Sequence, residues 1–318
     1  MRSALLAAGV LAWAGAARAE PADAAAPLRP PNLRPAAGST EAGLWGEADT
    51  AEAHVRVSAE RNLDPALNAY VRGTLCRLAP EYCDEMRVYV LDRQPMNAAA
   101  LPNGYVEVNS GLLLRASTED ELAFVLGHEI THFARNHGLI RWRNQKATAN
   151  LVTAVEMGIN LTAMAAMVST VNSGVPDLTR QLSSITRAAT SLNDMVYLKG
   201  MASTYAFSRE NETEADRLGF ERAAAAGYDR KAGVAIWRSL LAETSASDDP
   251  DVRTQETRAS VFSTHPVTTA RIAALAELAG DAPDRSQAEL QAAMKRHRAA
   301  IRPYLGEWLR EDLRRRDY

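Results

Sequence analysis

Apolar residues recur at helical spacing in the stretch that follows Ser117. They are Leu122, Val125, Leu126, Ile130 and Phe133. This spacing predicts an amphipathic helix with one apolar face. Thr118, followed three residues later by Glu121, fits a capping box, so the helix is predicted to begin there. It is predicted to end near His137 and Gly138, because glycine commonly follows the last turn of a helix.

Elsewhere the pattern predicts more helix than strand. Residues 48–78 read as helical, and the short apolar run 87–91 predicts a strand. Residues 102–104 form a turn signal, and the alternation over 105–108 predicts a second strand. The predicted fold class is therefore α+β, mostly α-helical, with a small β-sheet beside the helix that begins at Thr118.

The two ends of the chain differ from its middle. Residues 1–19 combine a positive start, an uncharged apolar run and an Ala-Arg-Ala site. They predict a signal peptide cleaved after Ala19, and hence export to the periplasm. Residues 20–47, rich in Ala and Pro, predict a flexible leader. The globular domain is expected over 48–280, followed by a charged C-terminal helical extension over 281–318.

Composition narrows the choice of function. The chain has 318 residues, 47% of them hydrophobic and 24% charged, with a net charge of −3, as in ordinary globular proteins. Without a basic excess, nucleic acid is not an expected partner. Cys76 and Cys83 are the two cysteines, and in an exported chain they are predicted to form a disulfide.

Inside the predicted helix, residues 128–132 read H-E-x-x-H. Residues four apart lie one turn above each other, so His128 and His132 can bind the same metal ion. Glu129 lies between them, where a general base is needed. The pattern predicts a catalytic zinc, which takes three protein ligands and leaves one position open. The alternative is a surface helix with two ordinary histidines.

The third ligand has to come from elsewhere in the chain. His137 would turn to the opposite side of a continuous helix, so we interpret it as a partner of the helix C-terminal dipole. Glu212 and Asp216 are four apart and share a face of a second predicted helix. Glu212 could bind zinc while Asp216 hydrogen-bonds the free ring nitrogen of a ligand histidine. We interpret the rival residues Glu210 and Glu214 as a solvated acidic face.

Six stretches match one protein family in the same order. They are 97–105, 106–113, 128–132, 211–216, 226–229 and 264–272. In these stretches the chain resembles the zinc metallopeptidases that include HtpX, BepA and the Ste-twenty-four-type CAAX proteases. The resemblance covers about residues 50 to 280. It implies a gluzincin-type domain with one Zn²⁺ per chain, held by His128, His132 and Glu212.

The resemblance also implies roles for other residues. Glu129 is the implied base, and Asp216 supports a ligand histidine. His265, in a His-Pro motif, is implied to lie near the metal, where it either stabilises the oxyanion or occupies the fourth metal position as a plug. A histidine ahead of the first turn of a helix is the alternative for His265. Arg271 is an oxyanion or structural partner, and 105–108 is an edge strand that pairs with substrate.

A long segment, 147–200, separates the two halves of the predicted site. No charged residue occurs from 157 to 176. We favour a pair of buried or lid helices, since the asparagines, serines and threonines in this stretch suit a membrane-spanning helix poorly. The alternative is proximity to a membrane surface, because HtpX-type relatives have transmembrane segments at this place.

Together these features predict a zinc-dependent endopeptidase of the bacterial cell envelope. Its expected partners are polypeptide substrates, and the resemblance implies that these are misfolded or unassembled proteins. The alternative is an envelope chaperone or assembly factor whose zinc site is latent, plugged by His265. A purely structural zinc site is a third alternative, which Glu129 argues against because such a site has no use for a base. The sequence makes no prediction of oligomeric state.

Overall fold

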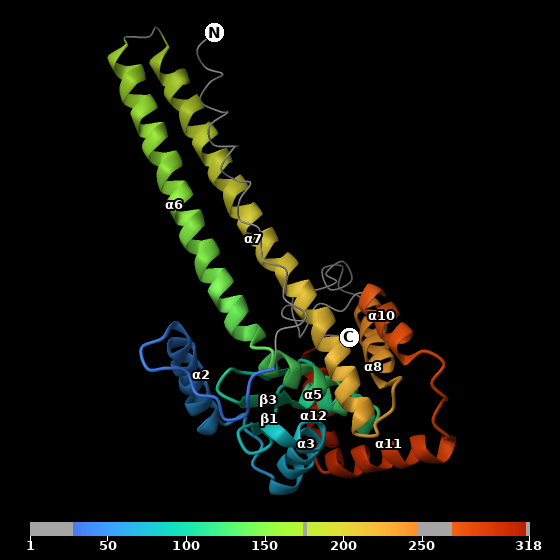
Figure 1. Ribbon diagram of the computed structural model, residues 1–318. Helices are drawn as coiled ribbons and strands as arrows, with labels where there is room; N and C mark the ends of the chain where they lie inside the picture. Colours follow the sequence, from blue (N-terminus) through green and yellow to red (C-terminus); the bar gives the residue numbers. More distant parts are fainter. Residues whose placement is uncertain (1–27, 174–176, 247–268, 316–318) are drawn as a thin grey trace.

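The computed structural model describes residues 28–173, 177–246 and 269–315. Figure 1 shows a body of helices around a small sheet, with two long helices extending from it as a hairpin. The helices are α2 (Thr40–Arg56), α3 (Pro65–Leu78), η1 (Pro80–Tyr82), α4 (Ser110–Arg115), α5 (Glu119–Ala134), α6 (His137–Asn172), α7 (Leu178–Ala225), α8 (Ala232–Ala246), α10 (Thr269–Ala279), α11 (Gln287–Ile301) and α12 (Leu305–Arg315). The strands are β1 (Arg87–Leu91), β2 (Ala98–Ala100) and β3 (Tyr105–Asn109). This confirms the predicted α+β class, mostly helical with a small sheet.

The sheet has the strand order β1-β3-β2, with β1 parallel and β2 antiparallel to β3. Both predicted strands form, but β3 is the central strand, because the chain folds back through β2 before entering β3. The prediction that 105–108 is the edge strand for substrate is therefore wrong. The strand at the edge beside α5 is β2, a short run of three alanines.

Helix α5 begins where its cap residues predicted. The Thr118 hydroxyl accepts a hydrogen bond from the Glu121 backbone N–H at 3.2 Å, and the Glu121 carboxylate accepts one from the Ser117 backbone N–H at 2.7 Å. The helix ends at Ala134, not at Gly138. Asn136, two residues before the predicted stop at Gly138, adopts the left-handed conformation at φ 54°, which asparagine tolerates, and so terminates α5.

The N-terminal helix predicted over 48–78 is two helices. Asp64 caps α3 and Pro65 occupies its first turn, so this pair starts a new helix instead of continuing the previous one. Helix α2 begins at Thr40, eight residues earlier than expected, with Ser39 as its N-cap. Part of the segment expected to be a flexible leader is thus helical.

Arg29 fastens the start of the described chain to the body. It is only 4% exposed, and its guanidinium lies 4.2 Å from the ring of Phe133 on α5. It donates to the Pro102 carbonyl at 2.9 Å, while its own backbone N–H donates to the Ala134 carbonyl at 2.8 Å. The residues before α2 therefore brace the C-terminal end of the helix that carries the H-E-x-x-H motif.

The core surrounds α5, which packs against α3, α7, α8, α11 and β2. The predicted disulfide is present and links Cys76 on α3 to Cys83 after η1. The C-terminal helices also join the body. His297 on α11 is buried between the Tyr70 hydroxyl at 2.9 Å and the Leu113 carbonyl at 2.8 Å. Helix α11 thus packs on α3 and α5, and α12 packs on α4.

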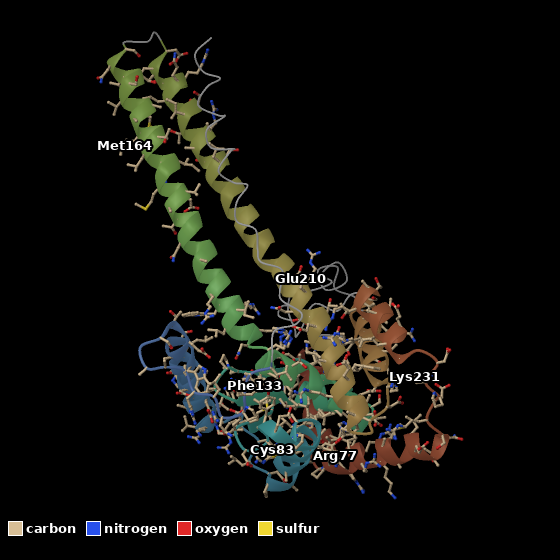
Figure 2. All side chains as sticks on the ribbon, in the orientation of Figure 1. Arg77, Cys83, Phe133, Met164, Glu210 and Lys231 are labelled. Atoms are coloured by element: carbon tan, nitrogen blue, oxygen red, sulfur yellow. A yellow bond between two sulfur atoms is a disulfide. The ribbon has the colours of Figure 1, made fainter. Side chains whose placement is uncertain are left out.

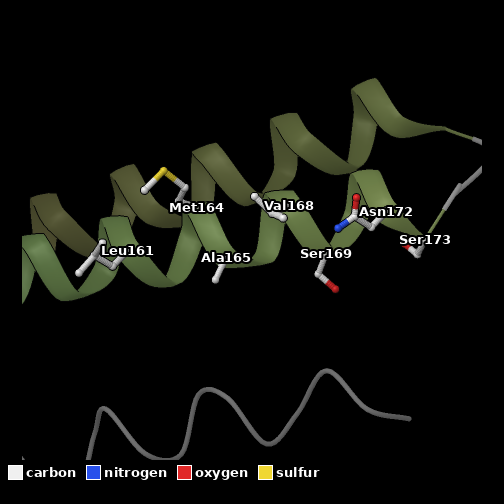
Figure 3. Close-up of a pocket in the computed structure, with 7 residues that line it drawn as sticks. All are labelled: Leu161, Met164, Ala165, Val168, Ser169, Asn172 and Ser173. Carbon is white, nitrogen blue, oxygen red and sulfur yellow. The ribbon is translucent and has the colours of Figure 1, made fainter.

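Helices α6 and α7 form the hairpin that leaves the body, and Figure 2 shows Met164 far out along it. Among the described residues, Thr153–Asn172 is the one stretch long and apolar enough to cross a membrane, with a mean hydropathy of 1.3 and 6% of its residues buried. Of the buried or lid helices expected here, the buried alternative is therefore wrong, because this part of α6 lies beyond the reach of the core. Figure 3 shows Leu161, Met164 and Val168 along one side of α6.

Candidate metal centre

Helices α5 and α7 meet at two glycines. A Cβ on Gly219 would lie 2.7 Å from the His128 backbone nitrogen, and a Cβ on Gly127 would lie 2.9 Å from the Gly219 carbonyl oxygen. Both distances are shorter than van der Waals contact, so only glycine permits this approach. The close crossing brings the acidic turn of α7 against the histidine turn of α5.

Gly219→Ala is expected to separate the two helices. The added methyl has only backbone to push against, so we expect a loss of about 1–3 kcal/mol in the free energy of unfolding. Metal affinity should fall as well, since Glu212 moves with α7. Urea denaturation and a chelator competition would measure the two effects. Gly43→Ala is the matched control, because a Cβ at this helical position in α2 meets nothing within 4 Å. Equal stability of Gly219→Ala and the unsubstituted chain would contradict the close crossing.

Three predicted ligands converge at this crossing. The Nε2 atoms of His128 and His132 are 3.1 Å apart. Glu212 Oε2 lies 3.3 Å from His128 Nε2, and Glu212 Oε1 lies 3.4 Å from His132 Nε2. Two imidazole nitrogens and a carboxylate are the donors that zinc takes in a catalytic site. Among the described residues, these three form the one cluster of His, Cys, Asp or Glu able to hold a metal ion.

A buried carboxylate orients His128. Asp216 Oδ1 lies 3.0 Å from His128 Nδ1 and accepts its proton in a hydrogen bond. Arg271 on α10 holds Asp216 from the other side, donating from Nε to Oδ2 at 2.6 Å and from Nη2 to Oδ1 at 2.7 Å. Trp237 on α8 donates to Asp216 Oδ1 at 3.4 Å, and its ring lies under the Arg271 guanidinium at 5.4 Å.

Arg271 thus acts on the site through carboxylates. Besides Asp216, its Nη1 lies 3.1 Å from Glu212 Oε2, and the side chain is 7% exposed. The resemblance implied that Arg271 is either an oxyanion partner or a structural partner, and its contacts with two carboxylates are those of a structural partner. Two buried carboxylates beside one guanidinium leave one negative charge that Arg271 does not compensate, which favours a further cation, either a metal ion or the protonated His128.

His137 contacts His132, and Glu214 contacts His137, contrary to both interpretations from sequence. His137 Nδ1 is 3.0 Å from His132 Nδ1, and His137 Nε2 is 2.9 Å from Glu214 Oε2. His137 starts α6, so it is not at the C-terminal end of a helix dipole. Glu214 is half-buried and pairs with Arg135, whereas Glu210, its predicted neighbour on a solvated face, is exposed as expected.

The pKa of His128 reflects its surroundings. Burial lowers this pKa, but hydrogen bonds to Asp216 and Glu212 outweigh burial and raise it to about 9. Without a metal, the imidazole therefore carries a second proton at neutral pH, on the Nε2 atom that faces Glu212. A metal ion has to displace this proton, so metal affinity is expected to decrease as the pH falls below 9.

Glu129 is buried at 3% exposure in the same turn of α5 as the two histidines. His265 lies outside the described residues. Sequence reasoning missed Gly127, Gly219 and Trp237, although two glycines inside apolar helical patterns are a signal of close packing. Trp237 carries no such signal, since a tryptophan at helical spacing reads as ordinary core.

Comparisons with known proteins agree with this geometry. The model of Peptidase family M48 matches residues 65–279. The chain is 28% identical over 249 residues to the Beta-barrel assembly-enhancing protease of Escherichia coli (strain K12), a match covering 76% of this chain and 45% of that one. The Putative beta-barrel assembly-enhancing protease of Vibrio cholerae is 28% identical over 230 residues, covering 70% and 43%.

A mitochondrial protein is similar as well. Metalloendopeptidase OMA1 of Bos taurus is 29% identical over 157 residues, which cover 48% of this chain and 26% of that protein. The matched part of the chain spans less than half the length of each of these relatives.

Proposed function

The chain belongs to peptidase family M48 and is therefore a metalloprotease. From this premise we propose that it is a zinc-dependent endopeptidase of the bacterial cell envelope. We propose misfolded or unassembled envelope proteins as its substrates. The names of the relatives from Escherichia coli and Vibrio cholerae, which concern β-barrel assembly, support this choice.

One observation carries the proposal: His128, His132 and Glu212 present three donor atoms that all lie within 4.8 Å of one another. A zinc ion bound by these three residues would act as a Lewis acid that activates water and polarises the scissile carbonyl. The donor set fits zinc because it combines two imidazoles and one carboxylate and leaves a coordination position open.

Glu129 is the proposed general base. Its carboxylate accepts the proton of the attacking water and delivers that proton to the leaving amine. Asp216 and Arg271 keep His128 and Glu212 in place. His265 is proposed either to stabilise the oxyanion or to plug the site, and His265→Ala separates the two roles: hydrolysis increases if the side chain is a plug and decreases if it assists the reaction.

Substrate is proposed to add to the outer edge of β2. Leu101 donates to Tyr105 of β3 at 2.8 Å, and Asn109 donates to Asn97 at 2.9 Å, so residues 97 and 101 face β3. By alternation, the backbone groups of Ala98 and Ala100 face outward. Ala100→Pro removes one outward N–H and is expected to raise KM about 2- to 12-fold, the equivalent of one hydrogen bond. Ala100→Ser keeps the N–H and should leave KM unchanged; an unchanged KM in both would exclude this edge.

The proposed location is the periplasm, where the chain arrives after its signal peptide, residues 1–19, is cleaved off after Ala19. Residues 1–27 lie outside the described part of the chain, and support comes from the Cys76–Cys83 disulfide, which suits an oxidising compartment. Within the mature chain we propose a metallopeptidase domain over 48–280 and a helical extension over 281–318.

The hairpin is proposed to lie close to a membrane surface. Leu161, Met164 and Val168 are 60%, 58% and 55% exposed on α6, and no charged side chain interrupts the stretch around them. Flotation with vesicles of phosphatidylethanolamine and phosphatidylglycerol tests this. The unsubstituted chain should float with the lipid, and a Leu161→Glu/Val168→Glu variant should not. If both stay in the dense fraction, the proposal of membrane proximity is wrong.

Removal of the metal tests the main proposal. Dialysis against a chelator should abolish casein cleavage, and about one equivalent of Zn²⁺ per chain should restore it, whereas Mg²⁺ should not. Cleavage that survives complete removal of zinc would exclude the proposed function. A chain that binds one zinc but cleaves nothing would favour the alternative of a chaperone with a latent site.

A further inference from the structure

The two histidines of the metal centre are oriented in different ways. Asp216 contacts His128 Nδ1 directly, at 3.0 Å. On the other histidine, the equivalent nitrogen meets a second imidazole: His132 Nδ1 is 3.0 Å from His137 Nδ1. Behind His137 stands a carboxylate, with Glu214 Oε2 at 2.9 Å from His137 Nε2. Each histidine is therefore backed by a carboxylate of α7, but His132 reaches its carboxylate through His137.

The protons in this chain of contacts have a single consistent arrangement. To bind a metal through Nε2, neutral His132 must carry its proton on Nδ1. That proton points at His137 Nδ1, which must accept it and therefore be unprotonated. The one proton of His137 is then on Nε2, where it faces Glu214.

The backbone break between α5 and α6 makes the contact. On one continuous helix, a residue five positions after His132 would lie about 140° around the axis and could not reach it. Asn136, at φ 54°, ends α5 and turns the chain, so that His137 begins α6 facing back onto His132. His137 is 4% exposed, and Arg135 pairs with Glu214, which compensates the charge behind it.

We propose that His137 and Glu214 are positioning residues for the metal, and that they act by fixing the proton of His132 on Nδ1 and directing its Nε2 lone pair at the ion. The proposal rests on the zinc centre of the proposed function. It does not depend on what the loaded centre hydrolyses. Groups that orient metal-binding histidines in this manner contribute about 10- to 100-fold to metal affinity.

Zinc affinity provides the test, measured by competition with a fluorescent chelator. The full chain is used in a Glu129→Gln background, so that the result is independent of peptide hydrolysis and of self-digestion. His137→Ala is expected to weaken zinc binding about 10- to 100-fold. His137→Asn places an amide oxygen near the position of Nδ1 and should recover most of that loss. Glu214→Ala should weaken binding to a lesser extent, because the His137 ring remains.

His297→Ala is the matched control, since this residue is also a buried, hydrogen-bonded histidine but lies on α11, away from the metal centre. If the role of His137 is purely structural, His137→Ala and His297→Ala should both lower the thermal stability of the metal-free chain. The two variants should then bind zinc with the same affinity. Zinc affinity of His137→Ala within twofold of the parent, or no recovery in His137→Asn, would overturn the proposal. A failure of the proposed function looks different: the parent binds zinc tightly, His137→Ala binds it weakly, and neither the chain with Glu129 nor any variant cleaves protein.

Discussion

Replacing Glu129 with glutamine is expected to abolish peptide hydrolysis and to leave the metal centre intact. The amide is nearly the size of the carboxylate but cannot accept a proton from water at neutral pH. Proton transfer by a positioned side chain contributes about 10²- to 10⁴-fold to rate, so residual casein cleavage should be at or below the limit of detection. Because Glu129 is not one of the three converging donors, zinc content should remain at about one per chain.

The measurement compares zinc content and casein cleavage in the two proteins side by side. Glu210→Gln is the matched control, since Glu210 is an exposed glutamate on α7, two residues before Glu212. It should retain both zinc and activity. If Glu129→Gln cleaves casein as fast as the parent, Glu129 is not the base. If the variant loses zinc together with its activity, the role of Glu129 is to hold the metal.

The largest effect on stability is expected from Arg271→Met. The guanidinium pairs with two buried carboxylates, Asp216 and Glu212, whose side chains are 6% and 3% exposed. Removing one partner of a buried ion pair leaves an uncompensated charge and costs about 3–5 kcal/mol. Arg271→Lys keeps a charge but not the two-pronged contact with Asp216, so its loss should be intermediate.

The effect should depend on pH in one direction. Hydrogen bonds from Arg271 and His128 lower the pKa of Asp216 although burial opposes them, so the ionised carboxylate stabilises the folded state above the usual pKa of Asp, about 3.9. This contribution is lost as the pH falls through the lowered pKa of the folded state. The deficit of Arg271→Met should therefore be largest near neutral pH and smaller in acid, where the stranded carboxylate can take up a proton.

Urea denaturation of the metal-free protein, at neutral pH and at the lowest pH where it stays folded, measures this difference. Arg302→Met removes an exposed arginine after α11 and should change the free energy of unfolding by no more than about 0.5 kcal/mol. A loss in Arg271→Met that equals this control, or that grows in acid, would show that Arg271 does not compensate the two carboxylates.

Much of the metal centre was predictable from the sequence because two of its residues, His128 and His132, are close together in the sequence. His128 and His132 are one helical turn apart, and the Thr118 cap and apolar spacing predicted the helix that carries them. Glu212 and Asp216 likewise share a helical face, so pairing them was also a question of spacing along one element. Arg271 and the order of the motifs came from the resemblance to a family.

Other predictions failed where the structure depends on contacts between distant segments. Strand β3 was expected at an edge, but residues 98–100 return to pair with its free side, and their three alanines carry little strand signal. The segment around α6 was expected to form buried or lid helices, and the buried alternative is wrong, because apolar composition alone does not say whether a helix reaches the core. Gly138 was expected to end α5, and Asn136 does so because it adopts a positive φ.

Periodicity in the sequence thus determined the H-E-x-x-H helix, the strands 87–91 and 105–108, and the acidic pair on a second helix, since helical and strand repeats depend only on neighbouring residues. Tertiary structure alone decided how these parts meet. The close crossing at Gly127 and Gly219 places Glu212 against the histidines, and the break at Asn136 turns His137 onto His132. Such contacts depend on the path of the chain between distant residues, and a local pattern carries no information about that path.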